Sequence, residues 1–174
     1  MPLPAMTNGC LPPDGSPYLA SLEEIRDRFV VEAPAGQERD QVFRAVHLAV
    51  EGMAYAFGPG QILLGGEFVT HRSGRLPVAR MVLVPTDWKS AWIHLSTDPR
   101  TLPWLTLEGV AVWKPLAVVA PRIQSVGGLV DAALARRERI GQWHALFSVE
   151  RDVGGKIVSD SRIGYVEVGH DVAR

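Results

Sequence analysis

The sequence has one cysteine, Cys10, in 174 residues, which excludes an internal disulfide and any zinc site built from several cysteines. It has no apolar run near the roughly 20 residues that a membrane-spanning helix needs, and no secretory pattern at its start. It also lacks an excess of either charge, since 18 Lys and Arg stand against 19 Asp and Glu. We therefore expect a cytoplasmic protein without a membrane segment and without general nucleic-acid binding.

Proline is concentrated at the start of the chain, where residues 1–20 hold five of the 13 prolines. This composition predicts an extended N-terminal arm over residues 1–20, because proline disfavours both helices and central strands. The remaining residues, 21–174, have the length and the hydrophobic content of one globular domain.

Helical and strand-like patterns alternate along this domain. Ser21 followed by Glu24 is a capping box that opens a short helix. Apolar spacing predicts a long amphipathic helix over 37–57, with Arg39 on its polar side. Further strands are predicted over 61–70, 76–85, 110–119, 145–151 and 163–168, further helices over 87–95 and 124–147, and a turn-rich stretch over 152–161. This order indicates an α+β (α/β-like) domain, with a mixed sheet flanked by helices.

A glycine pair, Gly65-Gly66, ends the strand predicted over 61–70, and a second strand follows after a short loop. This order resembles the nucleotidyltransferase signature, in which a strand ends in Gly-Ser or Gly-Gly and a later strand carries Asp-x-Asp. Glycine lets the backbone approach a triphosphate closely. Two carboxylates at i and i+2 share one strand face, where they hold Mg²⁺.

Weaker matches in the same order extend the resemblance along most of the chain. The matching segments are Leu11-Pro12-Pro13-Asp14-Gly15, Glu23 to Phe29, Gly66-Glu67-Phe68-Val69-Thr70, Pro77 at the start of the next strand, and Arg162 to Val168. With these segments the chain resembles a family of uncharacterised bacterial proteins regarded as distant relatives of the nucleotidyltransferases. The resemblance implies a nucleotidyltransferase-like fold and a bacterial toxin–antitoxin or defence setting.

The chain departs from this signature at the residues that carry the chemistry. Aligning Pro77 with the family proline places Ala79 and Met81 where the two aspartates stand, and neither side chain supplies the oxygen ligands that Mg²⁺ demands. Glu67 replaces the signature serine and brings negative charge to the phosphate position. We therefore expect a degenerate nucleotide site at Gly65, Gly66, Glu67, Thr70, Ala79 and Met81, with no catalytic residue, metal or cofactor.

Other residues have both a structural and a functional interpretation. Gly65-Gly66 is also typical of a strand bulge or of a close backbone approach. The tryptophans are typical of core residues, and the arginine cluster is typical of a solvated helix face. The same residues form a candidate interaction surface for a protein partner or a second copy: Trp88, Trp92, Trp104, Arg136, Arg137 and Arg139. The five histidines lack ligand spacing, and Cys10 lacks an assigned base.

Three functions stay open at this level. The leading hypothesis is a catalytically inactive nucleotidyltransferase-like protein that acts by binding, in which Ala79→Asp, Met81→Asp and Glu67→Ser together restore Mg²⁺ binding. The second is an active nucleotidyl- or phosphoryl-transfer enzyme with relocated carboxylates, drawn from Glu67, Asp87, Asp98 and Glu108. The third is a structural homo-oligomeric subunit assembled through the tryptophan-rich segment.

Overall fold

The computed structural model of the protein describes residues 3–34, 36–72, 77–105, 126–151 and 156–169. Its described strands are β1 (Tyr18–Ala20), β2 (Gly60–Gly66), β3 (Ala79–Pro85), β4 (Val130–Leu134), β5 (Val149–Arg151), β6 (Ile157–Arg162) and β7 (Val166–Val168). Its described α-helices are α1 (Leu22–Arg26), α2 (Gly36–Phe57), α3 (Trp88–Thr97) and α5 (Ile140–Phe147). Short turns of other helix types are η1 (Asp27–Val31), η2 (Glu67–Val69), η3 (Pro99–Trp104) and η4 (Arg137–Arg139).

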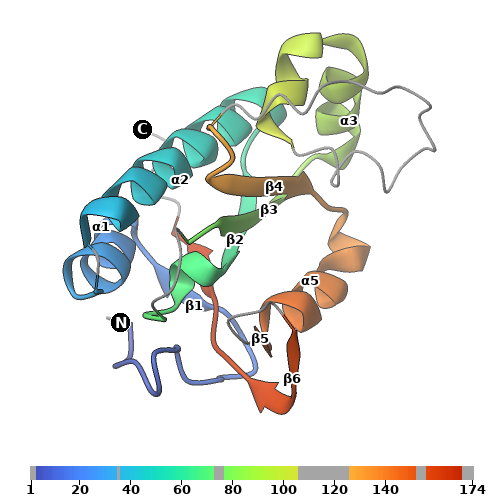
Figure 1. Cartoon of the computed structure of the whole chain (residues 1–174). Helices are drawn as coiled ribbons and strands as arrows, with labels where there is room; N and C mark the ends of the chain where they lie inside the picture. The colour runs from blue at the N-terminus through green and yellow to red at the C-terminus, as the bar shows by residue number, and fades with distance from the viewer. Residues whose placement is uncertain (1–2, 35, 73–76, 106–125, 152–155, 170–174) are drawn as a thin grey trace.

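Five strands form one mixed sheet in the order β1-β7-β2-β3-β4 (Figure 1). β2 pairs antiparallel with both β3 and β7, whereas β4 runs parallel to β3 and β1 runs parallel to β7. β5 and β6 pair separately as a two-stranded antiparallel sheet. Helices and a sheet that mixes parallel with antiparallel pairs confirm the predicted α+β class.

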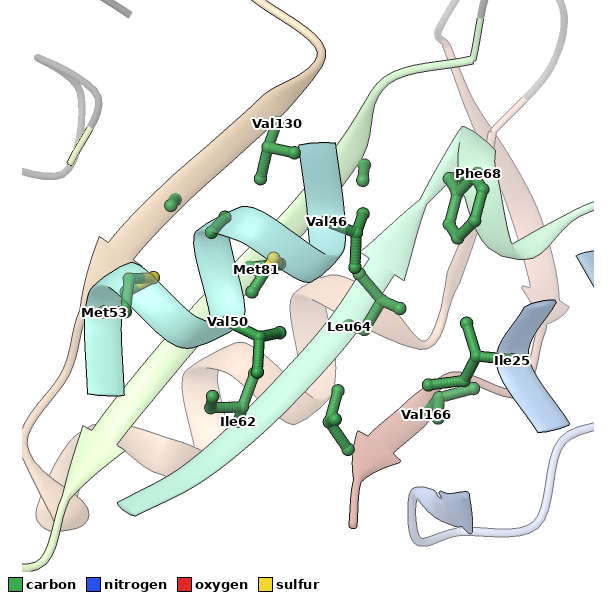
Figure 2. Packing of buried hydrophobic residues seen from close by; sticks show 14 of the residues in the cluster. Ile25, Val46, Val50, Met53, Ile62, Leu64, Phe68, Met81, Val130 and Val166 are labelled. Carbon is green, nitrogen blue, oxygen red and sulfur yellow. The ribbon is translucent and has the colours of Figure 1, made fainter. Parts of the chain in front are cut away.

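The long helix α2 covers one face of the sheet (Figure 1). Its apolar residues recur every three or four positions, so Val46, Val50 and Met53 lie on one side of the helix and are buried. These side chains pack against Leu64 of β2 and Met81 of β3 in the main core (Figure 2). The helix predicted over 37–57 is thus confirmed, as is the capping box between Ser21 and Glu24.

The shorter helix α5 covers the opposite face. Phe147 of α5 packs with Leu63 of β2 and Val82 of β3 in a second cluster of buried residues. Leu63 and Val82 each neighbour a residue of the α2-facing core in sequence, because successive strand side chains point to opposite faces. The two-sided burial explains why both strands read as nearly continuous apolar runs.

The helix predicted over 124–147 is wrong in its first half. Val130–Leu134 forms β4, which pairs with β3, and α5 begins at Ile140. The spacing of Val130 and Leu134 fits either structure, but in the strand Val130, Ala132 and Leu134 face α2 while Ala133 faces α5. Pairing with a strand about 50 residues away decides between the two, which local periodicity does not detect.

Several smaller predictions also need correction. The strands predicted over 61–70 and 145–151 are shorter, because residues 67–69 form η2 and residues 145–147 belong to α5. Arg39 lies inside the protein rather than on the polar side of α2, with 3% of its surface exposed. Residues of the stretch predicted to be turn-rich form β6, which pairs with β5. The strand predicted over 110–119 lies outside the described residues. At the end of the N-terminal arm, β1 joins the sheet as an edge strand beside β7.

Candidate functional site

The glycine pair lies where β2 meets the first residues of β3. Gly66 stands opposite Ala79 in the antiparallel register, and Gly65 stands opposite Arg80. Gly66 has a φ of 84°, and a Cβ there would lie 2.9 Å from the carbonyl oxygen of Val78. A Cβ on Gly65 would lie 2.8 Å from the ring of Phe147. Both positions therefore exclude a side chain for reasons that lie within the fold.

The two positions aligned with the signature aspartates face α2. Ala79 and Met81 are 0% and 1% exposed, and both belong to the core beneath that helix. Figure 2 shows Met81 among the side chains that pack between α2 and the sheet. A carboxylate at either position would therefore be buried among apolar groups, away from any ligand in solvent.

The other face of β3 carries a cation at this end. Arg80 alternates with Ala79 and Met81 and therefore shares the α5 side of the strand with Val82. Its guanidinium lies 3.9 Å from the carboxylate of Asp131 on β4. Neither β2 nor β3 contains an aspartate or a glutamate on either face. The carboxylate beside this end of β3 therefore belongs to Asp131 on the neighbouring strand β4, and it is paired with Arg80.

The segment after the glycines is a tight turn fixed from inside the protein. Thr70 donates its hydroxyl to the carbonyl of Glu67 at 2.8 Å, so this hydroxyl is engaged within the turn. Arg39 of α2 donates to the carbonyls of Phe68, Thr70 and Phe29. Burial lowers the pKa of Arg39, because the interior disfavours its charge. The arginine satisfies three backbone acceptors and ties the turn to α2 and η1.

Arg39 is the residue of this region that the sequence did not reveal. Its carbonyl partners come from two segments that follow or precede it by 10 to 31 positions. The pattern of neighbouring residues in the sequence does not predict hydrogen-bond partners at such separations. The one available signal was its place one turn before Val42 and Phe43 and two turns before Val46, close to the buried stripe of α2.

The tryptophan-rich segment lies at the opposite end of β3. Trp88 begins α3, and its ring stacks on that of Trp92, with centroids 6.1 Å apart and planes inclined by 23°. The guanidinium carbon of Arg136 lies 5.2 Å from the centre of the Trp88 ring, within the range of a cation–π contact. β3 spans seven residues, which separates this cluster from the glycine pair by roughly 20 Å.

The structure brings together only part of the predicted interaction surface. Trp88 contacts both Trp92 and Arg136, and Arg137 and Arg139 are exposed on the turn that follows Arg136. Trp104 instead packs its ring over Gly52 of α2, where a Cβ would lie 2.4 Å from the ring.

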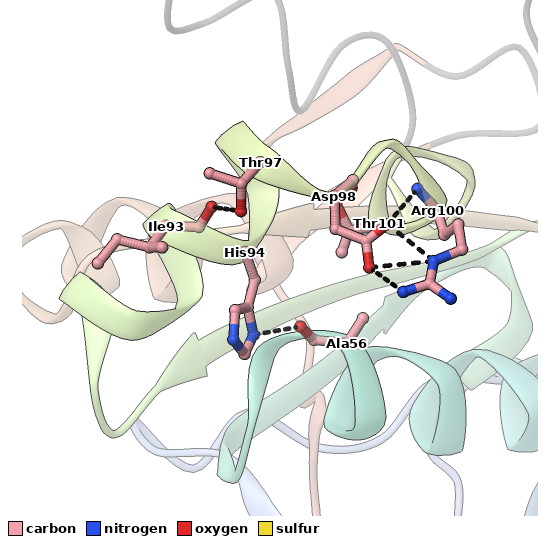
Figure 3. Close-up of polar contacts among 7 residues, drawn as sticks. All are labelled: Ala56, Ile93, His94, Thr97, Asp98, Arg100 and Thr101. Carbon is pink, nitrogen blue, oxygen red and sulfur yellow. Dashed lines mark hydrogen bonds and ion pairs between the residues drawn. The ribbon is translucent and has the colours of Figure 1, made fainter.

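The carboxylates considered for a relocated active site do not lie together in one site. Glu67 follows the glycine pair, whereas Asp87 lies beyond the other end of β3 and caps α3 by accepting from the Ser90 amide. Asp98 accepts from the guanidinium and the amide of Arg100 (Figure 3). Hydrogen bonds from Arg100 lower the pKa of Asp98 from 3.8 to about 2. Glu108 lies outside the described residues.

His94 and His144 have structural partners, and the cysteine is buried. The ring of His94 donates to the carbonyl of Ala56 at 3.2 Å and joins α3 to the end of α2 (Figure 3). His144 hydrogen-bonds the hydroxyl of Tyr165. Cys10 is buried, and burial raises the pKa of its thiol. Within the described ranges, no three His, Cys, Asp or Glu side chains are grouped so as to hold a metal ion.

Comparisons with family models, curated proteins and solved structures find no match to this chain. None of the helices in the described part of the chain has the length and apolar character needed to cross a membrane.

Proposed function

We propose that this protein is a catalytically inactive relative of the nucleotidyltransferases that acts by binding another protein. One observation supports the proposal: β2 ends in a glycine pair and lies antiparallel to β3, in the order on which the resemblance depends, yet neither strand contains a carboxylate. Two-metal transfer needs oxygen ligands beside the phosphates, and Ala79, Met81 and Arg80 supply none. The resemblance further implies a bacterial toxin–antitoxin or defence setting in the cytoplasm.

The surroundings of the glycine pair favour a role without nucleotide. Gly66 and Gly65 make space for the Val78 carbonyl and the Phe147 ring, so the fold already uses the space that glycine provides. Glu67 adds a negative charge directly after the pair. The filled space leaves no room for a triphosphate at the glycines, and the negative charge of Glu67 repels its phosphates.

Isothermal titration tests this proposal. The purified protein is titrated with each of the four ribonucleoside triphosphates, once with Mg²⁺ and once without it. We expect no heat of binding in any of these titrations. Nucleotide binding that depends on Mg²⁺ would overturn the proposal and favour the enzyme with relocated carboxylates. That alternative also requires turnover that Glu67→Ala abolishes. Light scattering during size exclusion tests the homo-oligomeric alternative, which requires a mass above 19.0 kDa.

A further inference from the structure

Two neighbouring parallel strands send the chain to opposite faces of the sheet. β3 leads into α3, which packs with α2 on one face, and β4 leads through η4 into α5 on the other. Figure 1 shows α3 and α5 diverging from the ends of these strands. Binding sites in open sheets lie beyond the carboxyl ends of parallel strands, where successive connections diverge in this way. Trp88 and Arg136 are the residues that meet there.

The aromatic part of this surface is a stacked pair with an exposed outer ring. Trp88 lies partly within the core, and Trp92 stacks on it one helical turn later with 37% of its surface exposed. Ile93 beside it is 47% exposed. A rigid indole held by a buried neighbour offers apolar contact at little cost in side-chain entropy, as do the tryptophans that dominate protein interfaces.

The charge around this aromatic pair is positive. Lys89 follows Trp88 on α3, and Arg137 and Arg139 lie within one turn after Arg136. Lys89, Arg137 and Arg139 are exposed and form no ion pair with a described carboxylate. Five other arginines do form such pairs: Arg28 with Glu32, Arg44 with Asp40, Arg72 with Glu150, Arg80 with Asp131, and Arg100 with Asp98.

The acidic groups in these two loops are few. Asp87 is engaged as the cap of α3, and Glu138 lies between the two arginines of η4. Among the described residues of α3, its cap and the turn at 136–139, four cations (Lys89, Arg136, Arg137 and Arg139) therefore stand against two carboxylates, the capping Asp87 and the exposed Glu138. Such a surface favours an anionic partner in both encounter rate and specificity.

We propose that the basic–tryptophan surface, defined as Lys89, Trp92, Ile93, Arg136, Arg137 and Arg139 around Trp88, binds an acidic protein segment that carries a large apolar side chain. The inference rests on the proposed function, a protein that acts by binding, and names the surface and the partner class. Acidic side chains complement the arginines, and the apolar side chain packs on Trp92 and Ile93. A protein partner is favoured over a nucleic acid because the chain has a net charge of −1 and the surface includes an exposed aliphatic side chain.

Fluorescence anisotropy tests the proposal with the full chain. The probe is a fluorescein-labelled peptide that alternates glutamate pairs with single phenylalanines. Three comparison probes replace glutamate by lysine, replace phenylalanine by glycine, or are a labelled oligouridylate. We expect the acidic phenylalanine peptide to bind most tightly and its affinity to fall as salt is raised.

The variants separate this surface from general charge effects. Arg137→Glu with Arg139→Glu, and Trp92→Ala separately, should each weaken peptide binding about tenfold or more. The matched control is Arg162→Glu, an exposed arginine on β6 in the separate two-stranded sheet, which should change affinity less than about twofold. All substituted side chains are exposed, and circular dichroism checks that each variant is folded.

The outcomes test the basic–tryptophan surface and the proposed function separately. No peptide binding, equal weakening by Arg162→Glu, or tighter binding of the lysine peptide or the oligouridylate would overturn the basic–tryptophan surface. The proposed function would then still stand if nucleotides and Mg²⁺ fail to bind. Mg²⁺-dependent nucleotide binding would instead overturn the proposed function, whatever the peptide does.

Discussion

Ala79 lies directly opposite Gly66 across the β2–β3 pairing, with its methyl group completely buried beneath α2. The residue thus sits beside the glycine on which the proposed nucleotidyltransferase resemblance depends, but on the face of the sheet that packs against a helix. The burial of this position changes the expected result of restoring the signature.

Introducing the two aspartates should destabilise the protein rather than create a metal site. Ala79→Asp with Met81→Asp places two carboxylates in an apolar core, which should lower the free energy of unfolding by roughly 4 kcal/mol or more. Thermal unfolding with and without Mg²⁺ measures this. Val78→Asp is the control because Val78 is 37% exposed, and it should cost little. A melting temperature of the double variant that rises with Mg²⁺ would contradict this expectation and support the sequence-based one.

Arg39 should contribute more to stability than any exposed arginine of α2. Arg39→Met leaves three buried carbonyls without their donor and should lower the free energy of unfolding by about 3 kcal/mol. Arg44→Met on the same helix removes an exposed pair with Asp40 and should cost less than about 1 kcal/mol. Urea denaturation measures both. Equal effects would mean that the carbonyl contacts of Arg39 add nothing.

Gly52 should tolerate no larger residue while Trp104 is present. A Cβ at Gly52 would lie 2.4 Å from the Trp104 ring, so Gly52→Ala should destabilise by about 1–3 kcal/mol despite the better helix propensity of alanine. Gly141→Ala in α5 meets nothing within 4 Å and should stabilise by up to about 1 kcal/mol. Differential scanning calorimetry compares the two. Adding Trp104→Leu should relieve much of the cost of Gly52→Ala, and a double variant no better than the single one would argue against the steric cause.

The pair of Asp98 and Arg100 should be visible in an acid titration. Hydrogen bonds from Arg100 lower the pKa of Asp98 from 3.8 to about 2 (Figure 3). A carboxyl whose pKa is depressed on folding stabilises the protein above its ordinary pKa, and this contribution is lost as the pH falls from 3.8 towards 2.

Carbon-detected NMR of the carboxyl group measures this titration directly. Arg100→Met should return the Asp98 midpoint towards 3.8, and Arg44→Met should leave it unchanged. A midpoint near 3.8 in the unsubstituted protein would show that Arg100 does not hold the carboxylate in solution.

Several elements could be predicted from the sequence because their determinants are local. The spacing of Val46, Val50 and Met53 predicts α2, and Asp87 predicts the start of α3. The absence of oxygen ligands at Ala79 and Met81 is likewise a property of residue type alone. These predictions needed only neighbouring residues, so the structure left them unchanged.

The tertiary structure decided the features whose partners are distant in sequence. Residues 130–134 are a strand because β3 supplies their hydrogen bonds, and Arg39 is buried because three remote carbonyls accept from it. The contact of Trp88 with Arg136 joins residues that follow two different strands. The sequence by itself determined which chemical groups the chain carries and which helices its local spacing favours. Which strands pair, and which charges meet or are buried, depended on hydrogen bonds and packing between segments far apart in the chain.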